Sequence, residues 1–178
     1  MNGTIEITSE EGKGSEFVIT LPFQIAEKPK EEPEENKKGE PGSIKGMKLL
    51  LAEDNELNAE IAKTLLQDEG AVITCVENGA EAVKCFEENQ AGTFDAILMD
   101  IMMPVMDGLE ATRTIRQMER EDAKEIPIIA MTANAFDEDV RKCILAGMNE
   151  HLAKPLDMEK LKQKLYECVI EKKEKEYI

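Results

Sequence analysis

The chain has 178 residues, of which 42% are hydrophobic, so it can form one packed domain with a short additional segment. Its formal net charge of −16 argues against binding to nucleic acid or to an anionic membrane through bulk electrostatics. No apolar run approaches the ~18 residues of a membrane span, and no signal-peptide pattern is present, so we expect a soluble, cytoplasmic chain.

Residues 1–23 have the pattern of a β-hairpin. The stretch 4–8 alternates apolar and polar residues, EEGKG provides a turn, and 15–21 returns with the run FVITL. The letters GKGS do not have the GxxxxGK[ST] spacing of a phosphate-binding loop. Because two strands alone are marginally stable in water, this hairpin is expected to need a partner.

Residues 24–46 differ in composition from both neighbours. They have many Glu, Lys, Pro and Gly residues and no aromatic residue. Such a stretch cannot bury enough surface to offset the entropy lost on ordering. We therefore predict a flexible linker here and a folded domain over residues 47–178.

The predicted domain alternates apolar runs with helical patterns five times. The apolar runs are 47–52, 71–76, 94–99, 126–131 and the shorter 151–153. Apolar residues between them recur at spacings of three and four: Leu57, Ile61, Leu65 and Leu66 before Gly70; Ala82, Val83 and Phe86; Leu109, Thr112, Ile115 and Met118; Val140, Ile144 and Leu145; Leu161, Leu165 and Val169. Continuous apolar strands that alternate with helices indicate a doubly wound α/β domain whose parallel sheet is covered on both faces.

The four cysteines are spread along the chain without a CxxC pair, so we expect small buried hydrophobes rather than ligands or disulfides: Cys75, Cys85, Cys143 and Cys168.

Polar residues follow the predicted strands. Glu53 and Asp54 come after the first strand, Asp100 after the third, Thr132 after the fourth and Lys154 after the fifth. Each residue alone could be a helix cap or a surface residue, but the carboxyl ends of parallel strands meet at one edge, where ligands bind. Three carboxylates at that edge repel one another unless a cation lies among them, and their oxygen atoms suit Mg²⁺.

Two other polar stretches near this edge have a structural explanation. Glu77-Asn78-Gly79 is interpreted as the start of the second helix, and Asp107-Gly108 as the start of the third. We assign Asp107 no catalytic role.

The signature segments of response-regulator receiver domains resemble four stretches of this chain, LLLAEDNELN, ILMDIMMPVMDGLEATRTIR, IIAMTANA and AGMNEHLAKPL, at similar spacings and in the same order. The resemblance covers residues 47–170. It implies a flavodoxin-like fold with strand order 2-1-3-4-5. It also implies that Asp100 accepts a phosphoryl group, and that Glu53, Asp54 and the backbone carbonyl of Met102 join Asp100 in holding Mg²⁺.

The resemblance assigns further roles at the same edge. Thr132 would be the switch hydroxyl, Lys154 would face the phosphate, and Pro155 would follow a cis peptide bond. Asn55, directly after the acid pair, resembles the variant found in the receivers of hybrid kinases. His151 departs from the family pattern, which usually has a switching Tyr or Phe there; either its ring packs like an aromatic one or its protonation acts as a switch.

The stretch NGTIEITSEEGKGSEFVITLPF resembles the last hairpin of a histidine-kinase ATP-binding domain. This resemblance implies that residues 1–23 are the end of such a domain in a hybrid sensor histidine kinase. The nucleotide-binding motifs precede this hairpin in that family, so no ATPase activity is expected of this segment. An unrelated hairpin is the alternative.

The function implied is a phosphorelay module rather than an enzyme. A partner histidine, on a kinase dimerisation domain or a histidine phosphotransfer protein, would pass its phosphoryl group to Asp100, and Thr132 would couple this to a conformational switch. Met102 and Asn134 lie two residues after the acceptor and the switch hydroxyl, and neither supplies a carboxylate, so slow self-dephosphorylation is expected; alternatively both are loop positions without kinetic weight. The competing functions are a haloacid-dehalogenase-like phosphatase, which requires a DxD on the first strand, and a degenerate receiver used for protein contacts.

Overall fold

The structure is a computed structural model that describes residues 3–10, 12, 14–20, 43–132 and 137–176. The chain divides into two compact units, Met1–Lys37 and Lys38–Ile178. No helix in the described ranges is both long and apolar enough to cross a bilayer.

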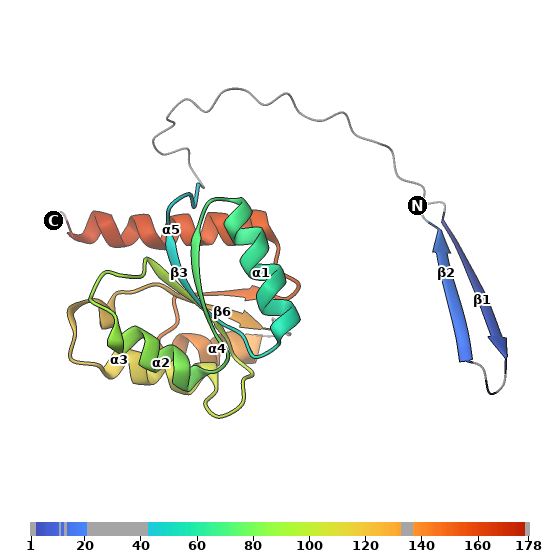
Figure 1. Cartoon of the computed structure of the whole chain (residues 1–178). Coiled ribbons are helices and arrows are strands. Elements are labelled where there is room, and N and C mark those ends of the chain that lie inside the picture. The colour runs from blue at the N-terminus through green and yellow to red at the C-terminus, as the bar shows by residue number, and fades with distance from the viewer. Residues whose placement is uncertain (1–2, 11, 13, 21–42, 133–136, 177–178) are drawn as a thin grey trace, which may run out of the picture. The chain divides into compact units, whose positions relative to one another are not determined.

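The first unit contains a two-stranded antiparallel hairpin, β1 (Thr4–Glu10) and β2 (Gly14–Thr20) (Figure 1). Gly12 in the connecting turn has a positive φ of 82°, which a glycine adopts without strain. Ile5 pairs with Ile19 and Ile7 with Phe17, so these four side chains share one face of the hairpin. All four are exposed, so nothing in the described part of the chain covers this apolar face.

The second unit is a five-stranded parallel sheet with the order β4-β3-β5-β6-β7 (Figure 1). In sequence terms this is the order 2-1-3-4-5, so the predicted doubly wound fold is confirmed. The elements are β3 (Lys48–Ala52), α1 (Glu56–Asp68), β4 (Val72–Val76), α2 (Gly79–Glu88), β5 (Ala96–Asp100), α3 (Gly108–Gln117), the 3-10 helix η1 (Glu121–Lys124), β6 (Ile128–Thr132), α4 (Asp137–Ala146), β7 (Glu150–Ala153) and α5 (Met158–Glu176).

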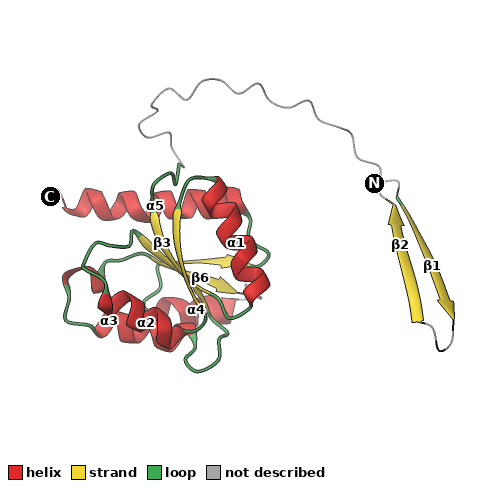
Figure 2. Cartoon of the chain, viewed as in Figure 1, coloured by secondary structure: helices red, strands yellow, loops and turns green. Residues whose placement is uncertain are grey.

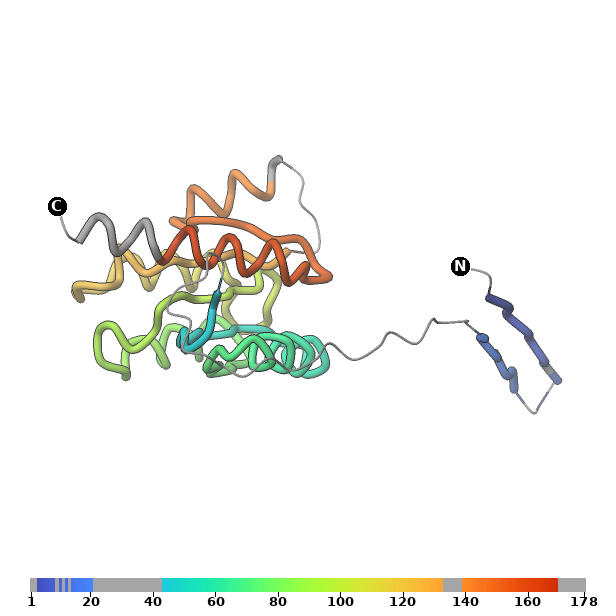
Figure 3. Tube along the Cα trace, turned by 90° about the horizontal axis from the view of Figure 1, so that it is seen from above, coloured from blue at the N-terminus to red at the C-terminus, as the bar shows by residue number. Residues whose placement is uncertain are grey.

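Helices cover both faces of this sheet (Figure 2). On one face, α2, α3 and α4 pack around Phe86, Ile115 and Cys143. On the other face, α1 and α5 pack through Leu66 and Leu165, and Figure 3 views this layer from above. Every residue of β5 and β6 is buried, which explains why these central strands have continuous apolar sequences.

The buried stripes of two helices differ from the predicted ones. On α1, the buried residues are Ala62 and Leu66, whereas Leu57, Ile61 and Leu65 are exposed. On α4, Cys143 and Ala146 are buried, whereas Ile144 is exposed and Leu145 is 84% exposed. Spacings of three and four identify a helix, but they do not fix which of its apolar residues face the core. One leucine and three small residues are buried on these two helices, and larger apolar residues beside them remain in solvent.

The packed unit begins earlier than predicted. Ile44 is 1% exposed and packs with the α1 and α5 layer. The N–H of Gly46 donates to the carbonyl oxygen of Gly70 at 2.8 Å. The predicted linker, 24–46, is therefore too long at its carboxyl end, because one isoleucine in a polar stretch was enough to anchor it; its residues 24–42 lie outside the described ranges.

The expectation that every cysteine is buried is wrong. Cys143 is buried, Cys85 and Cys168 are half-buried, and Cys75 is exposed. Cys75 lies on β4, an edge strand of the sheet that is only partly covered. The rule that the strands of a covered parallel sheet are continuously buried does not hold at the edge of this sheet.

Candidate functional site

The five predicted site residues lie at the carboxyl ends of four strands. Glu53 and Asp54 follow β3, Asp100 ends β5, Thr132 ends β6 and Lys154 follows β7. Glu53, Asp54 and Asp100 each offer a carboxylate oxygen, and these three oxygens all lie within 4.8 Å of one another. The structure thus brings together three acids, although Asp100 lies 46 and 47 residues after the other two in the sequence.

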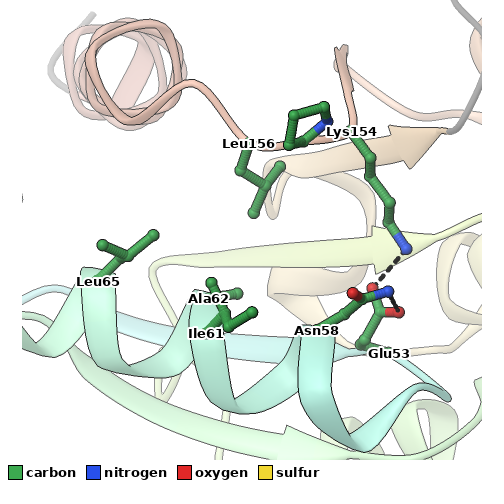
Figure 4. Close-up of a pocket in the computed structure, with 8 residues that line it drawn as sticks. Glu53, Asn58, Ile61, Ala62, Leu65, Lys154 and Leu156 are labelled. Carbon is green, nitrogen blue, oxygen red and sulfur yellow. Dashed lines mark hydrogen bonds and ion pairs between the residues drawn. The ribbon is translucent and has the colours of Figure 1, made fainter. Parts of the chain in front are cut away.

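Lys154 bridges two of these acids. Its Nζ donates to Glu53 Oε2 at 2.5 Å and to Asp100 Oδ2 at 2.6 Å, and Figure 4 shows the first contact. Both acids are buried. Burial lowers the pKa of Lys154, but its hydrogen bonds to Asp100 and Glu53 outweigh burial and raise that pKa above its ordinary value. The ammonium group therefore stays charged and compensates the buried acids.

Asp100 is poised between two opposing effects. Burial raises the pKa of its carboxyl group above the ordinary value, while the hydrogen bond from Lys154 and the N–H of Met102, which donates to Asp100 Oδ1 at 3.2 Å, act in the opposite direction. The net direction is upward. Lys154 is consequently a main reason for Asp100 to carry the negative charge that a nucleophile or a metal ligand requires.

Asn58 is a site residue that sequence reasoning missed. Its Nδ2 donates to Glu53 Oε1 at 3.0 Å (Figure 4). Asn55 caps α1, because its Oδ1 accepts the backbone N–H of Asn58 at 3.0 Å. The spacing of an N-cap followed three residues later by a polar side chain indicates the start of a helix, but it does not indicate the bond to Glu53.

Asp54 differs from its neighbour. It is exposed, whereas Glu53 is buried and its backbone N–H donates to the carbonyl oxygen of Val76 at 3.1 Å. The acid pair therefore presents one fixed, buried carboxylate and one carboxylate that is open to solvent.

Thr132 is 7% exposed and ends β6. Its carbonyl oxygen accepts the backbone N–H of Lys154 at 2.8 Å, which ties the ends of β6 and β7 together. Asn134, the residue predicted to influence dephosphorylation, lies outside the described residues.

Two glycines allow close packing of the loop between β5 and α3. A Cβ on Gly108 would lie 2.1 Å from the carbonyl oxygen of Asp100, and a Cβ on Gly79 would lie 2.5 Å from that of Met106. Within the loop Met102 is 78% exposed, and Val105 has a φ of 69°, which is strained for a β-branched residue. The sequence showed a loop here, but not that the loop is packed on two glycines.

A cavity of about 250 Å³ begins at Glu53 and Lys154 and continues along α1. Its apolar walls are Ile61, Ala62, Leu65, Pro155 and Leu156, and Figure 4 shows the α1 residues facing Leu156 across the opening. We call this cavity the α1 groove. The Lys154–Pro155 peptide bond at its end is cis, as the resemblance to receiver domains implies.

His151 lies in β7, where it is half-buried and pairs with Ala130. Its backbone N–H donates to Glu150 Oε2 at 3.3 Å. His151 is not a member of the group formed by Glu53, Asp54 and Asp100. Its position on the strand before Lys154 leaves both interpretations, the packed ring and the protonation switch, as predictions.

Residues 49–166 match the family model of the response regulator receiver domain. The autoinducer 2 sensor kinase/phosphatase LuxQ of Vibrio vulnificus is 34% identical over 165 residues, which cover 93% of this chain and 19% of that protein. Across the histidine kinases that it matches, the chain spans between 6% and 19% of their length.

Two solved structures are similar to the second unit. The receiver domain of the sensor histidine kinase PA1611 from Pseudomonas aeruginosa, which has a magnesium ion coordinated in its active site cleft, is 41% identical with a TM-score of 0.63, covering 70% of this chain and 98% of that one. The receiver domain of the response regulator Ssk1 from Saccharomyces cerevisiae, in complex with the histidine phosphotransfer signaling protein Ypd1, is 29% identical with a TM-score of 0.62, covering 71% and 91%.

Proposed function

Because this chain belongs to the response regulator receiver domain family, we propose that Asp100 is its phosphoacceptor and that the domain acts as a relay in two-component signalling. The observation that carries this proposal is the arrangement around Lys154. One ammonium group bridges two buried acids at the sheet edge where ligands bind, beside a third, exposed acid.

The transfer step needs an ionised Asp100. One of its carboxylate oxygens forms a bond to the phosphorus of a phosphohistidine, while the bond from that phosphorus to the imidazole nitrogen breaks and its electron pair stays on the imidazole. The product is an acyl phosphate. Lys154, which already contacts Asp100 Oδ2, is placed to neutralise an oxygen of the arriving phosphoryl group.

The residues at this edge also fit a magnesium ion. Three carboxylate oxygens within 4.8 Å, one of them on an exposed acid, form the hard oxygen donor set that Mg²⁺ prefers while it keeps several waters. Glu53, Asp54, Asp100 and the backbone carbonyl of Met102 would hold it. When bound, Mg²⁺ supplies positive charge that offsets the repulsion between Asp100 and the phosphoryl oxygens.

Thr132 is the proposed switch residue. It ends β6 beside the acceptor strand, since Asp100 pairs with Met131 in the sheet. Its hydroxyl group would move toward the phosphoryl group, and the shift would reach α4 through the connection that follows β6. This connection joins the site to the helix that exposes Leu145.

The partner we propose is a protein that carries the phosphohistidine, either a kinase dimerisation domain or a histidine phosphotransfer protein. The Ypd1 complex of the similar Ssk1 receiver supports this proposal. The α1 groove supports it as well, because an apolar opening next to Glu53 and Lys154 offers a docking surface beside the reacting atoms.

We further propose that the chain is part of a hybrid histidine kinase and that β1 and β2 close the ATP-binding domain of that kinase. The match to LuxQ covers 93% of this chain, so it extends to both sides of the predicted linker. The exposed face of Ile5, Ile7, Phe17 and Ile19 would then be covered by the preceding part of that domain. Such a kinase would work from the cytoplasm.

The haloacid-dehalogenase alternative fits poorly. Asp100 ends the third strand of the domain rather than the first, and the position of a second acid two residues later is occupied by Met102.

The proposed role of Asp100 is tested by mass spectrometry after incubation with acetyl phosphate and MgCl₂. The wild type is expected to gain one phosphoryl group and Asp100→Asn none. Asp107→Asn is the matched control, because this acid lies in the same loop and caps α3. Labelling of Asp100→Asn, or labelling without a divalent cation, contradicts the proposal.

A further inference from the structure

The first turn of α1 connects helix capping to the carboxylate of Glu53. Asn55 is the N-cap and Asn58 is the third residue of the helix. A polar side chain at this third position commonly turns back to the N–H of the N-cap residue. Here the Asn58 amide instead donates to Glu53 Oε1 at 3.0 Å, two residues before the cap.

The two oxygens of Glu53 therefore have different partners. Oε1 accepts the Asn58 amide, whereas Oε2 accepts Lys154 Nζ at 2.5 Å. An ionised carboxylate only accepts hydrogen bonds, so the amide nitrogen of Asn58 has to face it. Lys154 joins Oε2 to Asp100 Oδ2, and Oε2 is thus the oxygen of Glu53 on the Asp100 side.

We propose that Asn58 is a positioning residue that holds Oε1 of Glu53, so that a cation that replaces Lys154 meets Oε2 alone, and that it thereby favours Mg²⁺ over Ca²⁺. Magnesium ions require near-octahedral geometry with compact single-oxygen ligands. Calcium ions take six to eight oxygens and readily accept both oxygens of one carboxylate. A Glu53 carboxylate whose Oε1 is held by an amide suits the first ion better than the second. This inference rests on the proposed function, because it assumes that Glu53 faces a bound cation.

A purely structural role for the Asn58 side chain makes a different prediction. The cap of α1 uses the backbone N–H of Asn58 and the side chain of Asn55, so it survives a change of the Asn58 side chain. If the amide only supported the helix, its loss would change the affinity for both cations by the same factor. A change in the ratio of the two affinities is specific to the positioning role.

The experiment is calorimetric titration of the full chain with MgCl₂ and separately with CaCl₂. Asn58→Leu removes the amide at nearly constant size, and Gln67→Leu makes the same kind of change at an exposed position near the other end of α1. Loss of a hydrogen bond to a metal ligand typically weakens metal binding by about tenfold or more. We expect Asn58→Leu to bind Mg²⁺ about tenfold more weakly and Ca²⁺ less than about threefold more weakly, and Gln67→Leu to match the wild type.

Equal factors for the two cations, or unchanged affinity in Asn58→Leu, would overturn the inference and leave the proposed function intact. Circular dichroism of the variant checks that α1 is still formed. A wild-type chain that binds neither cation while it is folded would instead overturn the proposed metal site, and the positioning role of Asn58 with it.

Discussion

The α carbon of Gly108 lies so close to Asp100 that a Cβ added to it would be 2.1 Å from the Asp100 carbonyl oxygen. The N–H of Gly108 also donates to the carbonyl oxygen of Ile101 at 3.0 Å. The first residue of α3 is therefore pressed against the end of the strand that carries the proposed acceptor. Any side chain at this position has to displace either α3 or the backbone of Asp100.

Gly108→Ala is expected to destabilise the domain by about 1–3 kcal/mol, the usual cost of overpacking, and to slow phosphoryl labelling of Asp100. Urea unfolding and mass spectrometry measure the two effects. Gly92→Ala is the control, because a Cβ there meets nothing within 4 Å, although the φ of +78° still strains an alanine. The labelling rate of Gly92→Ala should match the wild type. A wild-type labelling rate in Gly108→Ala would contradict the idea that the position of α3 affects Asp100.

Lys154→Met is expected to bind Mg²⁺ more tightly and to accept phosphoryl groups more slowly. The substitution removes the positive charge that competes for Glu53 and Asp100 and that would face the phosphoryl group. It also leaves two buried acids without their counter-ion, at a cost of about 2 kcal/mol in the metal-free protein. Calorimetry, labelling kinetics and urea unfolding measure these changes. Lys160→Met, which affects an exposed pair with Asp157, should change none of them; weaker Mg²⁺ binding by Lys154→Met would show that the ammonium does not compete.

The buried pair of Arg120 and Asp122 predicts a pH dependence of stability. Burial raises the pKa of the Asp122 carboxyl group, but its bonds to Arg120 and to the N–H of Gly92 outweigh burial, so the pKa in the folded state is depressed. A carboxyl group whose pKa is depressed in the folded state stabilises the protein at pH values above its pKa in the unfolded state, which is about 3.9. This stabilisation disappears as the pH falls through the pKa of the folded state.

Asp122→Asn should therefore lower the free energy of unfolding by about 1.5–3 kcal/mol near pH 7, and the difference from the wild type should shrink steadily below about pH 4. Urea unfolding across this range is the measurement. Asp68→Asn, at the exposed end of α1, should show no such difference. A difference in the free energy of unfolding between Asp122→Asn and the wild type that does not change with pH would show that ionisation of Asp122 does not contribute to stability.

Met102→Asn is expected to shorten the lifetime of the acyl phosphate. Met102 lies two residues after Asp100, its backbone N–H donates to Asp100 Oδ1, and its side chain is 78% exposed. A thioether is a poor partner for orienting an attacking water by hydrogen bonding. An asparagine amide can orient such a water. Decay of the labelled protein gives the rate, and Val105→Asn is the control, since Val105 is exposed in the same loop at a φ that asparagine tolerates. Equal acceleration in both variants, or none in Met102→Asn, would rule out the water-positioning role.

Ile61→Glu is expected to separate partner docking from chemistry. The Ile61 side chain lines the α1 groove and takes no part in the hydrogen bonds between Lys154 and Asp100. Labelling by acetyl phosphate should remain at the wild-type rate, while transfer from a phosphorylated histidine phosphotransfer protein should fall by about tenfold or more, the typical loss at a central interface residue. Leu145→Glu, on the exposed side of α4, is the matched control. Unchanged transfer from that protein would show that the α1 groove is not the docking surface.

The sequence predicted the burial of those strands that are covered by helices on both faces of the sheet. The runs around Leu98 and Ile129 lie in central strands, so their burial follows directly from their composition. The exposure of the edge strand could not be predicted from its composition. The exposure of Cys75 depends on the strand order, which leaves β4 without an outer neighbour. The rotation of α4 depends on whether Cys143 or Leu145 packs better, and spacing alone does not decide it.

The same distinction applies to the site. That Glu53, Asp54, Asp100, Thr132 and Lys154 share one edge follows from the topology of a parallel sheet. The bond from Asn58 to Glu53 could not be predicted, because it depends on the side-chain conformation in the first turn of α1. The close approach of Gly108 to Asp100 depends likewise on the path of a loop.

The anchoring of Ile44 determines from which side the preceding chain reaches the domain. Ile44 comes before β3, and Gly46 bonds to Gly70, which comes before β4, so this attachment lies at the amino ends of the strands. The acceptor lies at their carboxyl ends, about 17 Å away for a strand of five residues. A phosphohistidine, whichever protein carries it, therefore has to reach the end of the sheet opposite to the one at which Ile44 is anchored.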